Sequence, residues 1–137
     1  MKFFFDNNLS PYLAHGIREL SKVATHVETV IHLTDRFPRN AKDLTWIGEL
    51  AHDGQWYIIS IDRFKKQHGA EREAIRRAGH TVFILDPQWS TQGFWAQSER
   101  LVKWWPQVVT HAELVSGGAY RVPWRHASAA KFQAIAF

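Results

Sequence analysis

The 137-residue chain contains no cysteine, which excludes a disulfide scaffold and any metal site built on thiolates. It also has no apolar run near the roughly 20 residues that are needed to cross a bilayer. The segment before Asp6 is too short for a signal peptide. We therefore expect a cytoplasmic protein with no membrane partner. Repeats and low-complexity tracts are absent as well, which favours an ordinary globular fold.

Composition and charge leave the function open. Hydrophobic residues make up 45% of the chain and charged residues 22%, the balance of a soluble globular protein. The formal net charge of +4 favours a polyanionic partner only mildly, since many proteins this basic bind nothing anionic. The function therefore has to be inferred from motifs in the sequence.

Three short apolar runs, at residues 3–5, 56–61 and 82–85, each end on an aspartate: Asp6, Asp62 and Asp86. Runs this rich in aromatic and β-branched residues are typical of buried strands in a parallel sheet, where both faces are covered. The carboxyl ends of parallel strands lie along one edge of the sheet, and open α/β sheets bind their ligands there. The sequence therefore predicts that these aspartates converge on one crevice.

The remaining pattern predicts an α/β fold with a mostly parallel sheet. Ser10-Pro11 is an N-cap followed by proline at the first helical position, and Gly54 suits a C-cap. A loop is expected at Thr34–Lys42 and a break at residues 116–118. We predict a domain at 1–115 and a tail at 116–137, in which Tyr120–Pro123 could add an edge strand. The expected strands are Lys2–Phe5, Val27–Leu33, Trp56–Ile61 and Thr81–Leu85, and the expected helices are Pro11–Ser21, Asp43–Asp53, Ala70–Arg77 and Gly93–Thr110.

Asp43 opens a predicted helix and shares its face with Ile47 and Leu50, at i+4 and i+7. An acidic residue on the stripe that faces the sheet needs a partner, because an unpaired buried charge is costly. Asp43 could therefore join the three aspartates that follow strands. At about 5 Å and an effective dielectric near 20, each pair of charges repels by roughly 3 kcal/mol. Such a group either takes up protons or binds a divalent cation.

Oxygen-only ligands suit Mg²⁺ or Mn²⁺, and one or two such ions can activate water against a phosphodiester. Basic residues flank the aspartates along the chain. They could hold an RNA backbone, although they also suit an ordinary solvated surface. They are Arg36, Arg39, Lys42, Arg63, Lys65 and Lys66.

The ordered set of Asp6-Asn7 after a strand, Asp43 at a helix start and Ser60-Ile61-Asp62 after a strand resembles the PIN-domain ribonucleases. The closest likeness, over about residues 1–110, is to the VapC-type toxins of bacterial toxin–antitoxin systems. The resemblance implies a three-layer α/β/α sandwich, Mg²⁺-dependent RNA cleavage, homodimers and inhibition by a cognate antitoxin. It also implies that Asp6, Asp43 and Asp62 are metal ligands, with Asp86 at the fourth acidic position.

The roles of Ser60 and Asn7, and the function of the whole domain, each have an alternative interpretation. Ser60 stands where a hydroxyl supports the third acid; it and Asn7 either orient ligands or merely cap turns. The whole domain could instead be a non-catalytic PIN-like module that binds a partner protein or nucleic acid. A receiver-like or phosphatase fold is disfavoured by the lack of an Asp-x-Asp motif after the first strand. No Gly-x-Gly-x-x-Gly motif indicates a dinucleotide site.

Overall fold

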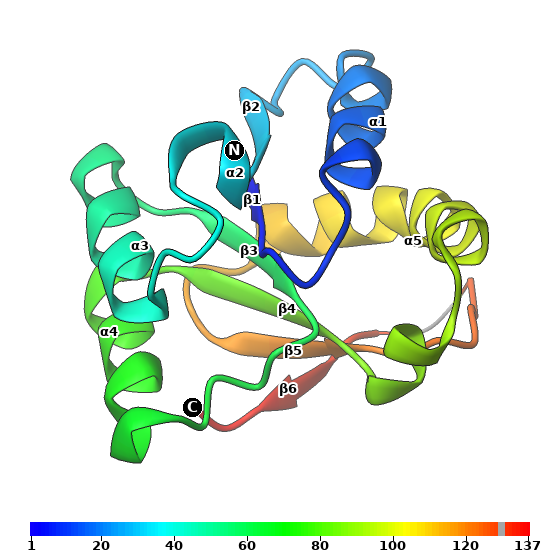
Figure 1. Ribbon diagram of the computed structural model, residues 1–137. Coiled ribbons are helices and arrows are strands. Elements are labelled where there is room, and N and C mark those ends of the chain that lie inside the picture. Colours follow the sequence, from blue (N-terminus) through cyan, green and yellow to red (C-terminus); the bar gives the residue numbers. More distant parts are fainter. Residues whose placement is uncertain (129–130) are drawn as a thin grey trace.

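A six-stranded sheet in the order β2-β1-β3-β4-β5-β6 forms the centre of the protein (Figure 1). The computed structural model describes residues 1–128 and 131–137. The first five strands of the chain are parallel, and only β6 is antiparallel to its neighbour. The strands are β1 (Lys2–Phe5), β2 (Thr29–His32), β3 (Tyr57–Ser60), β4 (Thr81–Leu85), β5 (Ala119–Val122) and β6 (Gln133–Ile135).

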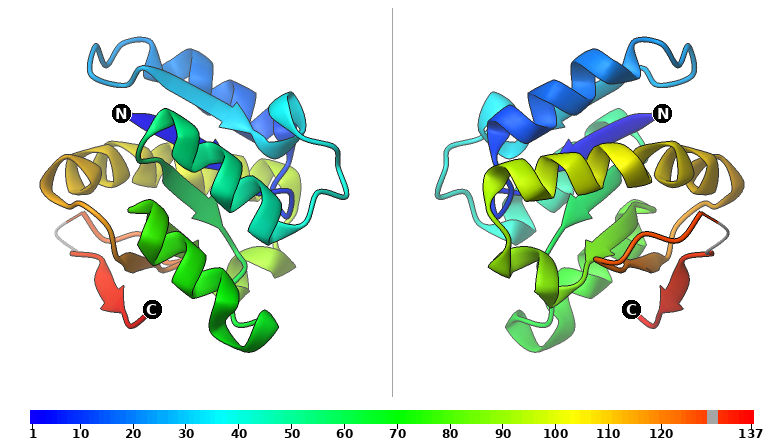
Figure 2. Two further views of the ribbon diagram at one scale, coloured as in Figure 1. Left: turned by 90° about the vertical axis from the view of Figure 1, so that its left-hand side faces the viewer. Right: turned by 90° about the vertical axis from the view of Figure 1, so that its right-hand side faces the viewer.

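Helices cover both faces of this sheet, so the predicted three-layer α/β/α sandwich is confirmed (Figure 2). On one face α1 and α5 pack on the sheet, and on the other α3 and α4 do so. A short helix, α2, follows β2. The helices are α1 (Pro11–Ser21), α2 (Leu33–Arg36), α3 (Asp43–Leu50), α4 (Ala70–Ala78) and α5 (Phe94–Leu114). Within the described residues, no helix combines the length and apolar character that a membrane crossing needs.

The phenylalanines of β1 explain why the strand pattern in the sequence is an unbroken apolar run. Successive side chains of a strand point to opposite faces. Phe3 and Phe5 therefore enter the core beneath α1 and α5, whereas Phe4 enters the core beneath α3 and α4. All three are fully buried. Alternation is lost because both faces need apolar side chains.

Most predicted elements are present with shifted ends. The first helix and the Thr81–Leu85 strand have the predicted bounds, and β2 and β3 are shorter than predicted. The helix expected at Asp43–Asp53 ends at Leu50 and continues as a 3₁₀ turn over Ala51–Asp53. The loop expected at 34–42 begins inside α2, whose first turn is capped by the His32 side chain.

The last part of the chain extends the sheet by two strands. β5 lies where a strand was expected near Tyr120–Pro123, but it is an inner strand rather than an edge strand. The reason is that residues 133–135 return antiparallel to β5 and take the edge themselves. Residues 129–130 of this tail lie outside the described part of the chain.

Candidate metal centre

The strand ends that carry Asp6 and Asp62 are direct neighbours. Phe5 of β1 is in register with Ile59 of β3, and the Asp6 amide donates to the Ile59 carbonyl over 3.0 Å. Asp62 follows β3 by two residues. The parallel pairing thus brings these two aspartates, 56 positions apart in the printed sequence, to one edge of the sheet.

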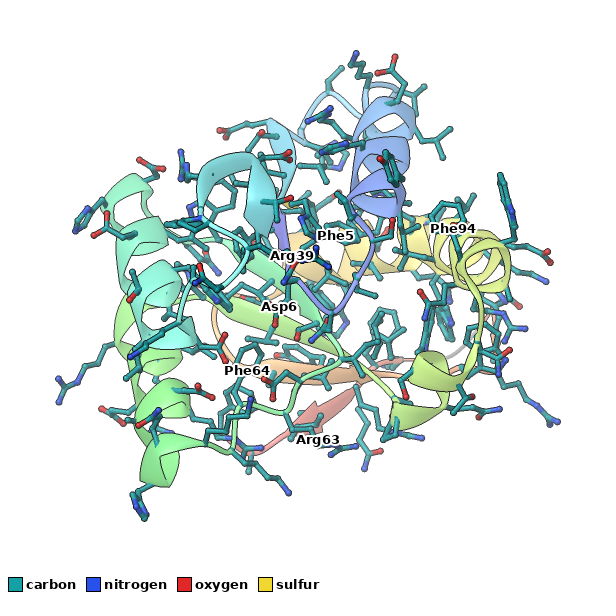
Figure 3. All side chains as sticks on the ribbon, viewed as in Figure 1. Phe5, Asp6, Arg39, Arg63, Phe64 and Phe94 are labelled. Carbon is teal, nitrogen blue, oxygen red and sulfur yellow. The ribbon has the colours of Figure 1, made fainter. Side chains whose placement is uncertain are left out.

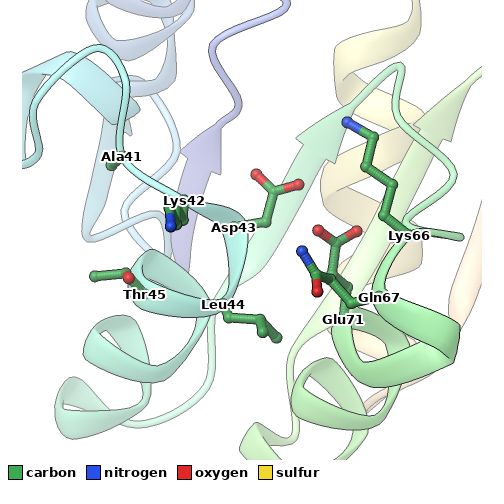
Figure 4. Close-up of a pocket in the computed structure, with 8 residues that line it drawn as sticks. All are labelled: Ala41, Lys42, Asp43, Leu44, Thr45, Lys66, Gln67 and Glu71. Atoms are coloured by element: carbon green, nitrogen blue, oxygen red, sulfur yellow. The ribbon is translucent and has the colours of Figure 1, made fainter.

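Two helices deliver further carboxylates to the same edge. Asp43 opens α3 with Ile47 one turn below it, and Glu71 lies in the first turn of α4 with Ile75 one turn below. Both isoleucines are buried on the sheet, so each acid is directed over the sheet edge. Figure 4 shows Asp43 and Glu71 facing one another across a pocket. Single carboxylate oxygens of Asp43, Asp62 and Glu71 all lie within 4.8 Å of one another.

Ser60 connects Asp6 to Asp62. Its hydroxyl donates to Asp6 Oδ2 over 2.7 Å and accepts the Asp62 amide at 2.9 Å. The Asn8 side chain donates to the Ser60 hydroxyl at 3.0 Å, and the Asn7 amide donates to Asp6 Oδ1 at 2.7 Å. Both oxygens of Asp6 are thereby occupied, and the hydroxyl predicted to support the third acid bonds to the backbone of that acid.

Asp43 and Asp62 are each held through one oxygen. Trp46 Nε1 donates to Asp43 Oδ1 at 3.0 Å. The Phe64 amide donates to Asp62 Oδ1 at 2.8 Å. Fixing one oxygen in this way orients each carboxylate toward the cluster that it forms with Glu71.

Glu71 is the most unusual acid of the group. It is 3% exposed, and among the described residues its Oε1 atom has no hydrogen-bond partner. Burial, a hydrogen bond with Asp43 and the negative charges of Asp43 and Asp62 raise the pKa of Glu71 to about 7. A buried carboxylate oxygen without a partner costs free energy unless a proton or a cation satisfies it.

The pKa of Asp6 is raised to about 6, chiefly by burial. Hydrogen bonds from Ser60 and Asn7 oppose this shift, and the charges of Asp43 and Asp62 add to it. Asp6 therefore interacts electrostatically with Asp43 and Asp62, although it is not one of the three acids whose oxygens lie within 4.8 Å.

The three clustered acids fit a hard divalent cation. Two ligand oxygens on opposite sides of a Mg²⁺ ion are about 4 Å apart, and two on opposite sides of a Ca²⁺ ion are about 5 Å apart. The observed spread within 4.8 Å is thus compatible with one shared ion. Donors of oxygen alone, together with the orphaned Oε1 of Glu71, suit Mg²⁺ or Mn²⁺ in preference to softer metals.

Asp86 does not join this cluster. Arg121 on β5 is in register with Ile84 of β4, and its guanidinium reaches the carboxylate beyond the end of that strand. The two form a bidentate pair, with Nε and Nη2 of Arg121 at 2.7 and 2.6 Å from the Asp86 oxygens. The acid that joins Asp43 and Asp62 is Glu71 instead. Sequence reasoning missed Glu71, although its i+4 relation to Ile75 repeats the Asp43–Ile47 signal.

Asn7 contacts Asp6 through its backbone amide, whereas Arg36 lies away from the acids. The Asn7 side chain donates to the Arg39 carbonyl at 3.0 Å, and the Asn8 side chain donates to Asp6 Oδ2 at 3.4 Å and to the Ser60 hydroxyl at 3.0 Å. The Arg36 guanidinium pairs with Asp53 at 2.6 Å and lies 5.4 Å from the Trp56 ring. It is thus directed toward the amino-terminal end of β3, away from the clustered acids.

The other basic residues are spread around the acids. Lys42 and Lys66 line the pocket of about 380 Å³ that contains Asp43 and Glu71. Lys66 Nζ is 4.0 Å from Asp62 Oδ2. Arg39 lines a neighbouring pocket of about 480 Å³ that follows Asp6 along the sheet edge. On the loop after Asp62, Lys65 is exposed. Arg63 on the same loop is half-buried (Figure 3).

Fold and site together define an α/β domain with a carboxylate cluster at the carboxyl edge of a parallel sheet. Residues 1–87 match the family described as "PIN like domain". The chain therefore belongs to the PIN-like family. PIN-like domains are typically nucleases that require divalent metals, and the acids described above lie within the matched region. Neither a comparison with curated proteins nor one with solved structures gave a match.

The acid cluster makes the metal-free protein sensitive to pH. Glu71 and Asp6 have folded-state pKa values of about 7 and 6, above the ordinary 4.5 and 3.8. The folded state therefore holds more protons than the unfolded chain between about pH 4 and 7, and stability should fall as pH rises through that window. At pH 8, Glu71→Gln should stabilise the metal-free protein by about 1–3 kcal/mol, because it removes one buried negative charge.

Urea unfolding at pH 5 and pH 8 in the presence of a chelator measures this effect. Glu73→Gln is the matched control, since Glu73 lies on the exposed face of the same helix and pairs with Arg76 and Arg77. The control should not gain stability at pH 8. A Glu71→Gln protein that is less stable than its parent at pH 8 would show that the carboxylate is satisfied within the fold.

Proposed function

We propose that this protein is a Mg²⁺- or Mn²⁺-dependent endoribonuclease that hydrolyses RNA phosphodiester bonds. The observation that carries the proposal is the buried Oε1 atom of Glu71 beside Asp43 and Asp62, which has no hydrogen-bond partner among the described residues. A protein that kept Glu71 only for structure would be expected to pair this oxygen, as it pairs Asp86 with Arg121. The membership of the PIN-like family supports the same conclusion.

Asp43, Asp62 and Glu71 are the proposed metal ligands. Asp6 is proposed to add its negative charge to that of the three ligands and to position Asp62 through Ser60. When bound, the cation supplies a polarised water and offsets the charge that develops on the phosphodiester. Asp86 is not part of the proposed ligand set, because its charge is already balanced by Arg121.

Basic side chains on either side of the acids are proposed to hold the RNA. Lys42 and Lys66 lie in the pocket of the proposed ligands, where the phosphate to be cleaved would bind. Arg39 lines the adjacent polar pocket, where its guanidinium has no acidic partner within the described residues. Arg63 and Lys65 follow Asp62 on the outer loop. These charges are suited to contacts with the RNA backbone, which carry no sequence preference.

The toxin role rests on the resemblance to VapC-type proteins in the order of Asp6, Asp43 and Asp62 and in the strands and helix that carry them. We propose on that basis that the protein is the toxin of a toxin–antitoxin pair, that it forms homodimers in the cytoplasm, and that a cognate antitoxin inhibits it. A small DNA-binding protein encoded next to this chain would support that assignment.

Asp62→Asn should lower RNA cleavage by about 100-fold or more, because loss of a metal ligand should cost at least as much as loss of a residue that orients one. A labelled RNA incubated with Mn²⁺, Mg²⁺ or a chelator measures this. Asp86→Asn is the matched control and should retain cleavage. Cleavage that persists in the chelator would contradict the proposal. RNA that stays intact with every metal, yet binds equally well to parent and Asp62→Asn, would indicate the non-catalytic binding module instead.

Arg39 and Arg36 provide a paired test of the RNA path. Arg39→Gln should weaken RNA binding and reduce the slope of log affinity against log salt by about one, because one phosphate contact is lost. Arg36→Gln should change neither quantity, since this guanidinium is engaged by Asp53 and the Trp56 ring. Fluorescence anisotropy at several salt concentrations gives both values. Equal effects of the two substitutions would refute the proposed path along the Arg39 pocket.

A further inference from the structure

The loop that carries Asp62 into α4 has an unusual backbone. Phe64, Gln67 and His68 have φ values of 56°, 61° and 54°, in the left-handed region that residues with bulky side chains rarely adopt. Phe64 is nevertheless fully buried. Such a conformation persists only where the surrounding structure holds it. The contacts that hold this loop therefore also hold Asp62.

Arg72 of α4, directly after Glu71, makes the polar contacts to this loop. Its Nε and Nη2 atoms donate to the Arg63 carbonyl at 3.1 and 2.9 Å. Its Nη1 atom donates to the Ala136 carbonyl at 3.0 Å, and the guanidinium lies 4.4 Å from the Phe137 ring. One side chain thus joins the metal-site loop to the segment after β6. The carboxyl-terminal end of the chain lies beside that loop in Figure 1.

A row of aromatic rings makes the apolar contacts. The Phe137 ring meets the Phe64 ring edge-on at 6.4 Å, and Phe64 meets Trp46 at 6.0 Å. Phe64 and Trp46 also donate hydrogen bonds to the acids: the Phe64 amide to Asp62 and the Trp46 indole to Asp43. The row of rings therefore connects Phe137 to the two residues that orient Asp62 and Asp43.

We propose that residues 136–137, joined to α4 by Arg72, form a clamp that positions Asp43 and Asp62 for the cation. Arg72 is in this view a positioning residue, and the segment after β6 is part of the metal site although it lies beyond the matched residues 1–87. The proposal rests on the proposed metal site. Lysine cannot reproduce these contacts, because the planar guanidinium donates in two directions while its face lies over a ring.

Mn²⁺ affinity of the metal-free full chain, measured by titration calorimetry or by electron paramagnetic resonance, tests the clamp. Arg72→Lys keeps the charge but removes the fork, and should weaken Mn²⁺ binding by about 10- to 100-fold, the usual effect of losing a residue that orients a ligand. Arg76→Lys on the same helix is the matched control, since Arg76 pairs with exposed Glu73, and should bind as the parent does. Thermal melting without metal shows whether each variant is folded.

Phe137→Ala provides a second test that leaves every charge in place. It should also weaken Mn²⁺ binding, while Phe137→Tyr should retain the parent affinity because the ring is kept. If Arg72→Lys does not fold, the comparison of Phe137→Ala with Phe137→Tyr tests the clamp by itself. Folded Arg72→Lys and Phe137→Ala proteins with parental Mn²⁺ affinity would overturn the clamp and leave the metal site intact. A parent chain that binds no Mn²⁺ would overturn the proposed function and the clamp with it.

Discussion

Electrostatic repulsion among buried and half-buried carboxylates is the constraint on which the rest of this structure depends. Asp43, Asp62 and Glu71 place oxygens within 4.8 Å of one another at an edge of the sheet, with the buried Asp6 close behind. Burial and the negative charges of Asp43 and Asp62 raise the pKa of Glu71 to about 7 and that of Asp6 to about 6. The fold therefore keeps an arrangement that is unfavourable at neutral pH without a counter-ion. PIN-like domains usually need divalent metals, and a bound cation would offset this repulsion.

The surrounding structure is organised to hold these acids in place. The Ser60 hydroxyl, the Trp46 indole and the Phe64 amide each donate to one carboxylate, and the Ser60 hydroxyl also fixes the backbone of Asp62. Phe64 accepts a left-handed backbone conformation to do so. Local departures of this kind, offset by dense packing around them, are expected where a site must be preorganised. Arg72 and Phe64 also contact residues 136–137, so the segment after the edge strand β6 packs against the loop that carries Asp62.

The sequence predicted the part of the site that depends on local pattern and parallel topology. Asp6 and Asp62 were expected to meet because each follows an apolar strand, and Asp43 because it lies one turn above a buried isoleucine. Glu71 carries the same helical signal but was not predicted, because it lies within a helix and does not follow an apolar strand. The partner of Asp86 could not be foreseen, since Arg121 reaches it only through the register of β5. Register between strands distant in sequence depends on tertiary packing, which no local pattern records.

A crystal of this protein grown with Mn²⁺, with anomalous diffraction recorded at the manganese edge, tests the central claim most directly. The account predicts an ion about 2.0–2.3 Å from oxygens of Asp43, Asp62 and Glu71 together. An ion bound without Glu71, or a cluster that stays metal-free while Lys66 neutralises it, would contradict the account.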